Sequence, residues 1–234
     1  MKKITASFVL AGLLGCFGSA QAGMIASTKT VALTETDWDE ILSFKKFDTL
    51  LGILTSIDFL LSGTTSGIAR AENKGTSASN LTLVISTNLI LTRPDAKTIV
   101  IATPLFSEIF KVKKYDKVTD FAGTSGITTA TQTATALNSA TYSDEVDLLL
   151  FSGSGTIDLG LKTIGNSSAI GSGNITSDFS TSAGGYATVT YHYTDAPVAP
   201  AADAVIPEPA SFAIMGLGLG LLGVTRRRRS INAA

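Results

Sequence analysis

Alternation of apolar and small polar residues is the feature that most constrains the fold of this 234-residue chain. Between residues 51 and 61 every odd position is apolar or β-branched, while most even positions are polar or glycine. Side chains of a strand point alternately to its two faces, so this period of two predicts a strand buried on one face. The same kind of pattern predicts strands at 67–72, 81–91, 98–102, 146–151, 156–162 and 186–194.

Short segments rich in glycine, serine, asparagine and proline separate these strands. They predict turns at residues 62–63, 73–75, 93–95, 152–155 and 184–185. Seven or more short strands joined by such turns are typical of two packed sheets, so we expect an all-β fold, a two-sheet antiparallel β-sandwich. Residues 38–47 and 105–117 leave a local alternative open, because each is amphipathic enough for a short helix.

Charge is distributed unevenly along the chain. Six of the 18 basic residues lie near the two ends together with one acid, Glu208, which leaves 12 basic and 18 acidic residues in the body. An acidic body is repelled by phosphate groups and anionic lipid. Nucleic acid is therefore not an expected partner.

The N-terminus has the three parts of a secretory signal peptide. Two lysines open the chain, an apolar run follows, and Ala20 and Ala22 form a small-x-small cleavage site. We expect export through the Sec translocon and removal of residues 1–22 by signal peptidase. An acylated lipoprotein is the alternative, because residues 13–16 loosely resemble a lipobox ending at Cys16, the only cysteine of the chain.

The C-terminus combines a linker, a short apolar segment and a basic cluster. Residues 197–206 are rich in alanine and proline, and a glycine-rich apolar run at 210–225 follows. Sixteen helical residues rise only about 24 Å, short of a hydrocarbon core of roughly 30 Å, so this run suits a temporary tether. The run is bracketed by Pro207, Glu208, Pro209 on one side and by Arg226, Arg227, Arg228, Arg229 on the other. Arginines stay cytoplasmic under the positive-inside rule, so the body is expected to face outward.

The order of these elements over residues 205–229 resembles the PEP-CTERM sorting signal. The resemblance implies processing by an exosortase, a membrane transpeptidase-like protease, with cleavage near residues 207–209. It also implies a Gram-negative producer of exopolysaccharide and biofilm, in which the protein is first held in the inner membrane and then reaches the cell surface or the exterior. The expected domains are a signal peptide at 1–22, an extracellular β-sandwich at 23–196, a linker at 197–206 and a sorting signal with a short transmembrane helix at 207–230.

Residues 42–194 are similar to the choice-of-anchor E domain of bacterial surface proteins. The similarity rests on segments 47–54, 80–91, 120–124, 146–161 and 186–194. It implies an extracellular module without assigned chemistry. We therefore expect a structural or interaction protein associated with exopolysaccharide or the biofilm matrix, with no cofactor.

Few residues suit catalysis. His192 is the only histidine, so a Ser-His-Asp hydrolase would depend on it, and we expect it to lie on a strand face without a partner. The Gly-x-Ser-x-Gly elbow of many hydrolases is not found before a helix. We expect no enzymatic activity, and a hydrolase is the less favoured alternative.

Binding chemistry has three aspects. Zinc needs several Cys or His ligands, and the body offers only His192, so no zinc site is expected. Calcium accepts carboxylates, but the acidic clusters at 37–40 and 144–147 lack the spacing of an EF-hand, so solvated strand ends are favoured over a calcium site and no metal site is expected. Lysines at 111, 113, 114 and 117 form a basic patch that suits either a solvated surface or contact with an anionic polysaccharide. A carbohydrate-binding module is the main alternative function, with Trp38, Tyr142 or Tyr186 as stacking platforms.

Overall fold

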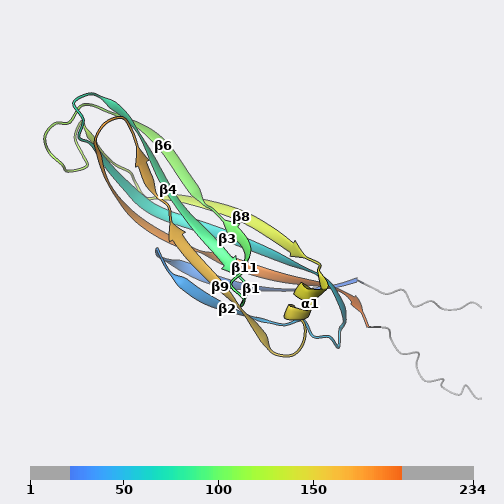
Figure 1. The fold of residues 1–234 in the computed structure, drawn as a ribbon. Helices are drawn as coiled ribbons and strands as arrows, with labels where there is room; N and C mark the ends of the chain where they lie inside the picture. Colours follow the sequence, from blue (N-terminus) through green and yellow to red (C-terminus); the bar gives the residue numbers. More distant parts are fainter. Residues whose placement is uncertain (1–21, 197–234) are drawn as a thin grey trace, which may run out of the picture. The chain divides into compact units, whose positions relative to one another are not determined.

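A computed structural model describes residues 22–196, which form a sandwich of two antiparallel sheets (Figure 1). The all-β prediction is therefore confirmed for this part of the chain. Within these residues, none of the helical structure is long and apolar enough to cross a membrane. The elements are, in chain order, β1 (Ala22–Glu35), β2 (Asp39–Lys45), β3 (Gly52–Asn73), β4 (Ser79–Thr92), β5 (Thr98–Ala102), β6 (Leu105–Val112), β7 (Gly126–Thr128), β8 (Gln132–Tyr142), α1 (Glu145–Phe151), β9 (Thr156–Gly165), β10 (Ser168–Ile170) and β11 (Ile175–Asp195).

Each sheet is built around one or two long strands. In the first sheet β11 pairs with β3 along its whole length and with β1 on its other edge. The second edge of β3 is covered by β8 and then by β7. In the second sheet β4 pairs with β9 and β10 on one edge and with β5 and β6 on the other, while β2 extends the sheet beyond β9.

Apolar side chains on the facing sides of the sheets form two clusters. The larger one lies toward α1 and contains the buried rings of Phe44, Phe59 and Phe151. The smaller one consists of Ala69, Ala71, Leu81, Leu83, Ile85 and Val112. Between the clusters, β3 and β4 contribute the buried side chains of Thr65 and Thr87. A polar layer therefore crosses the interior of the sandwich.

The predicted turns at residues 62–63 and 184–185 are wrong, because both pairs lie inside long strands. Gly63 and Gly185 are cross-strand partners in the ladder of β3 and β11. A Cβ atom on Gly185 would come within 2.0 Å of the carbonyl oxygen of Ser62. Glycine is needed there for close approach of two backbones, and not for a reversal of the chain. Both strands consequently continue where the sequence predicts a break.

The predicted strand at residues 146–151 is also wrong, because this segment forms α1. Asp144 precedes the helix in an extended conformation, and Glu145 and Asp147 stand in its first turn. Carboxylates at that position interact favourably with the helix dipole. The buried ring of Phe151 fixes the end of the helix in the larger apolar cluster.

The two stretches with a helical alternative are strands. In β2, Leu42 and Phe44 are buried while Ile41 and Ser43 are exposed, which is the alternation of a half-buried strand. Seven residues of β2 pair with β9. In the other stretch, residues 105–112 form β6, which pairs with β4 along its whole length, and residues 113–117 belong to the loop that follows.

The sandwich has two distinct ends (Figure 1). At the terminal end β1 begins, β11 ends and α1 packs. The opposite end, the tip, carries the turn between β3 and β4 and the loops at 113–125 and 171–174. Asn73 joins the β3–β4 turn to the loop at 113–125, since its Nδ2 donates to the carbonyl oxygens of Ser77 and Lys113, both at 2.8 Å. The 22 residues of β3 place the two ends about 70 Å apart.

Candidate functional site

The processing sites predicted from the sequence flank the described domain at its terminal end. Ala22 is the first residue of β1, and its cross-strand partner is Thr194 near the end of β11. Beyond β11, the N–H of Ala196 donates to the carbonyl oxygen of Leu51 at 3.0 Å. The segments that precede Ala22 and follow Ala196 therefore leave the domain from the same end.

Only Ala22 among these residues is described by the structure. Ala20, Pro207, Glu208, Pro209, Arg226, Arg227, Arg228 and Arg229 lie outside residues 22–196. A Cβ atom on Gly23 would lie 2.3 Å from the ring of Tyr193. The predicted cut after Ala22 would thus fall at the first step of the β1–β11 ladder, and the cut itself stays a prediction.

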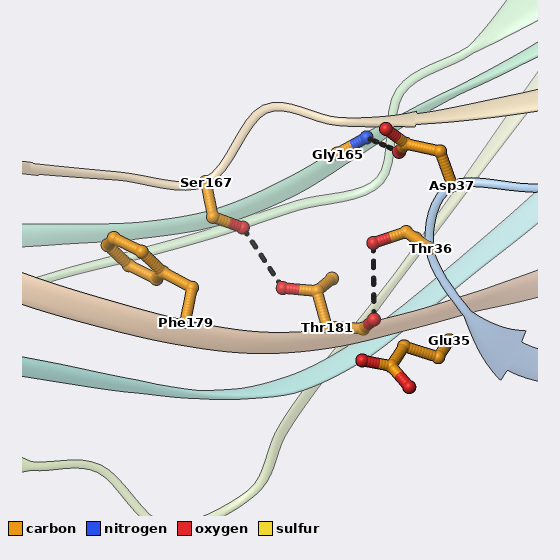
Figure 2. A pocket seen from close by; sticks show the side chains of 7 residues that line it. All are labelled: Glu35, Thr36, Asp37, Gly165, Ser167, Phe179 and Thr181. Carbon is orange, nitrogen blue, oxygen red and sulfur yellow. Dashed lines mark hydrogen bonds between the residues drawn. The ribbon is translucent and has the colours of Figure 1, made fainter.

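A polar hollow lies where the chain passes from the first sheet to the second. We call it the notch; its volume is about 270 Å³, and Figure 2 shows its lining. Three segments that are distant in the sequence form it: the β1–β2 connection, the β9–β10 connection and the first third of β11. The lining residues are Glu35, Thr36, Asp37, Gly165, Ser167, Phe179 and Thr181.

Hydrogen bonds fix several groups of the notch (Figure 2). Asp37 accepts a bond from the N–H of Gly165 at 2.6 Å through Oδ1. The hydroxyl of Thr36 donates to the carbonyl oxygen of Thr181 at 3.2 Å, and the hydroxyls of Ser167 and Thr181 lie 3.2 Å apart. These bonds connect the two sheets at the notch and hold its floor in place.

The lining combines three kinds of chemistry. Within residues 22–196, the Glu35 carboxylate and Oδ2 of Asp37 make no hydrogen bond or ion pair to the protein, so both can accept bonds from a ligand. The hydroxyls of Ser167 and Thr181 can donate as well as accept. Phe179 adds an aromatic ring that is half buried against the smaller apolar cluster. Acceptors, hydroxyls and one ring in a small hollow suit a ligand that carries many hydroxyl groups on an apolar frame.

The aromatic residues predicted as platforms occupy other places. Trp38 packs against the larger cluster, and its Nε1 donates to the carbonyl oxygen of Ala183 at 3.1 Å. Tyr142 packs edge-on against Phe59, with ring centroids 5.2 Å apart. Tyr186 is half buried on β11. Phe179 lines the notch instead, and no local motif distinguishes it in the sequence.

His192 has a partner, contrary to prediction. Its Nε2 lies 2.8 Å from Oδ2 of Asp58, and Asp58 also accepts a bond from the hydroxyl of Thr141 at 2.6 Å. The pKa of Asp58 is lowered: the Thr141 bond has the largest effect, burial opposes it, and the hydrogen bond and electrostatic interaction with His192 lower the pKa further. Ser56 stands across the ladder from His192, but no hydrogen bond joins their side chains in the described chain. The group is part of the outer face of the first sheet.

The two acidic clusters are separate in the structure. Asp37 lines the notch, whereas Asp39 lies 3.8 Å from Lys162 on the second sheet. Asp147 in α1 forms an ion pair with Arg93. Across residues 22–196, no three His, Cys, Asp or Glu side chains are grouped so that they could hold a metal ion.

The predicted basic patch lies at the tip. Lys111 belongs to β6, and lysines 113, 114 and 117 belong to the loop that follows it. Tyr115 in this loop donates its N–H to the carbonyl oxygen of Gly75, and the ammonium group of Lys74 lies 5.6 Å from its ring centre. The patch is therefore the part of the domain farthest from both termini.

Structural comparisons give weak likenesses only. The chain is 10% identical to a chain in the structure of the infectious bursal disease virus Gx strain, covering 83% of this chain and 42% of the viral one, with a TM-score of 0.16. The VP2 subviral particle of infectious bursal disease virus gives 13% identity, coverage of 80% and 42%, and a TM-score of 0.18. The chain thus spans less than half the length of these viral chains, and the scores are too low to indicate a shared fold. Among curated proteins, none matches the sequence.

A family model does match the C-terminus. The PEP-CTERM protein-sorting motif covers residues 205–229. This match does not include the sandwich, so the resemblance of residues 42–194 to the choice-of-anchor E domain stays a prediction. The recognition of the sorting signal is confirmed, and it supports an exported surface protein that an exosortase processes.

Proposed function

We propose that the chain is a non-enzymatic matrix protein that binds extracellular polysaccharide through the notch after export. The observation that carries this proposal is the lining of the notch, which offers free carboxylate oxygens, hydroxyls and the ring of Phe179 within one hollow. Signal peptidase and the Sec translocon would act on the precursor, and the inner membrane would hold it until an exosortase acts.

Sugar recognition follows from the chemistry of these groups. Adjacent hydroxyls of a pyranose can donate to the carboxylates of Glu35 and Asp37, and bonds to charged acceptors are stronger than neutral ones. The apolar face of the ring can pack on Phe179. No basic residue is among the described residues that line the notch, so a neutral or amino sugar fits better than a uronic acid.

The position of the notch also favours a binding role. It lies at the open side of the sandwich, where β1 and β2 are the outermost strands of their sheets. A polymer can therefore pass across it without entering the interior. The described residues begin and end at the terminal end, whereas Glu35 lies at the other end of β1.

Binding of the secreted protein to neutral polysaccharides tests the proposal, with affinity electrophoresis or a glycan array as the measurement. Glu35→Gln removes a charged acceptor, and Phe179→Leu removes the aromatic face while it keeps an apolar side chain against the smaller cluster. Each should weaken binding about tenfold. Glu40→Gln is the matched control, since it removes one exposed carboxylate from β2 outside the notch. No binding to any glycan, or equal binding by all variants, would refute the proposal.

A further inference from the structure

Exposed aliphatic side chains gather at the terminal end of the sandwich. Leu50 is 85% exposed and Ile53 69%, where the chain enters β3. Val146 and Leu149 are 76% and 67% exposed on the outer face of α1. We call these four residues the end patch. Contiguous exposed apolar surface of this kind marks contact with another apolar body.

The two halves of the end patch are neighbours in the fold. Ile53 and Leu149 line one shallow hollow of about 360 Å³, together with Leu54 and Leu148. Val146 and Leu149 are three residues apart in α1 and so share one face of the helix. The helix already directs Phe151 into the larger apolar cluster, so the interior does not account for these two side chains.

The chain leaves the domain beside the end patch. Gly52 is the cross-strand partner of Asp195, and the N–H of Ala196 is bonded to the carbonyl oxygen of Leu51. Residues 197–209 separate this point from the apolar run of the sorting signal. Even fully extended, that connection spans no more than about 45 Å. A membrane-held tail therefore keeps the end patch close to the bilayer, which raises its effective concentration there.

Charge near the end patch is mixed. Lys45 and Lys46 line a hollow beside Leu50, while Asp48 and Glu145 lie in the same region. Neither sign prevails, so attraction to anionic headgroups is not the cause of contact. Apolar insertion into the interface between water and lipid is the interaction that these side chains can make.

We propose that the end patch rests on the outer surface of the bilayer that holds the uncut sorting tail. This inference depends on the sorting route stated above. The contact holds the terminal end of the sandwich on the membrane and keeps residues 197–209 near the surface where a membrane protease works. A second copy is a poorer occupant, because four aliphatic side chains do not supply the roughly 800 Å² per partner of a stable interface.

A fluorescent probe can test the contact in the chain that remains after the expected signal-peptide removal, residues 23–234, in which the sorting tail is the only membrane segment expected from the sequence. These residues contain no cysteine, so Leu149→Cys gives one site for an environment-sensitive dye. Ile109→Cys is the matched control, since Ile109 is a 63% exposed aliphatic residue on β6, away from the end patch. Both chains are placed in phosphatidylcholine vesicles without exosortase.

The expected result is blue-shifted emission at position 149 that spin-labelled lipid quenches several-fold more than at position 109, with little effect of salt. A water-exposed dye at position 149 in chains that float with the vesicles would overturn the inference. Blue-shifted emission that spin-labelled lipid does not quench would also overturn it, because it would indicate that residues 197–209 cover the dye. A blue shift that is lost on dilution to one chain per vesicle would overturn it as well, because it would indicate contact with a second copy.

Failure of the sorting route gives a different result. Chains whose tail does not enter the bilayer would not float with the vesicles at all, whatever the dye reports. A second variant guards against a local effect of the dye. It carries the dye at Leu50→Cys and combines this with Val146→Ser and Leu149→Ser. Lipid quenching of this dye should be lost while the chain still floats with the vesicles. Unchanged quenching in that variant would contradict the proposed contact.

Discussion

The hydroxyl groups of Thr65 and Thr87 lie 2.8 Å apart between the two sheets, and both side chains are fully buried. Thr65 also donates to the carbonyl oxygen of Ser182 at 3.4 Å, so Thr87 is the donor in the pair. The two residues form the polar layer between the apolar clusters. Within the described residues the Thr87 hydroxyl bonds to Thr65 alone, whereas Thr65 also bonds to Ser182.

Removal of one hydroxyl should therefore cost more than removal of both. Thr65→Val leaves the hydroxyl of Thr87 buried without a partner, which should lower the free energy of unfolding by about 1–3 kcal/mol. The double variant Thr65→Val, Thr87→Val should be close to wild type, because both polar groups are gone. Urea denaturation measures the difference, with exposed Thr135→Val as the control. Additive losses in the double variant would show that the pair is not coupled.

A second prediction concerns the buried carboxylate of Glu72 at the tip. Its oxygens accept bonds from the hydroxyl of Ser125 at 2.5 Å and from the N–H of Phe121 at 2.9 Å. Glu72→Ala leaves both donors unpaired and should lower stability by about 3 kcal/mol. It should also release the loop at 113–125, so that trypsin cuts faster after Lys117.

The matched control for this variant is Glu108→Ala, which removes an exposed carboxylate from β6. Glu72→Gln keeps one acceptor and should fall between the two. Melting temperature and the rate of tryptic cleavage are the readouts. If Glu72→Ala melts and is cut like Glu108→Ala, the carboxylate does not hold the loop.

Alkaline pH should destabilise the domain through Tyr191. This residue is buried, its hydroxyl donates to the carbonyl oxygen of Lys45 at 2.9 Å, and burial raises its pKa to about 12. An unfolded tyrosine ionises near pH 10, so the unfolded chain loses this proton first. The contribution to stability is complete below about pH 10 and is lost as the pH rises to about 12, a total of roughly 2–3 kcal/mol.

Tyr191→Phe should remove this alkaline step. At neutral pH the variant should lose about 1 kcal/mol, because the carbonyl of Lys45 no longer receives the hydroxyl bond. Denaturation curves at pH 8 and pH 11.5 provide the comparison, with Tyr186→Phe as the control on the same strand. An equal loss of stability with pH in wild type and Tyr191→Phe would contradict the assignment.

Strands were predictable where the alternation is intact and bounded by strong turn residues. The predictions at 81–91, 98–102 and 156–162 correspond to β4, β5 and β9. In contrast, β8 has the sequence of small residues QTATALNSATY, and β1 is exposed at most positions. Neither strand shows the apolar contrast on which the prediction depends, so both were missed.

Long strands and the notch have causes that are not local. The small residues at 62–63 and 184–185 are typical of turns, but their role appears only when the two strands are paired. The notch joins Glu35, Gly165 and Thr181, and the His192–Asp58 pair spans 134 positions. A pattern read within a short window contains no such contacts. The sorting signal was recognisable because its elements are contiguous.

The last prediction concerns the sorting signal itself. Replacement of Pro207, Glu208 and Pro209 by alanine leaves the apolar run and the four arginines unchanged, so the tail should still enter the membrane. The exosortase should then fail to cut, because its motif is missing, and the uncut precursor should accumulate in the membrane fraction. Immunoblots of membrane and secreted fractions measure the two forms.

The matched control replaces Pro197 and Pro200 by alanine. This variant alters prolines of the linker outside the matched residues 205–229 and should mature normally. Normal maturation of the first variant would mean that this motif does not direct the cut.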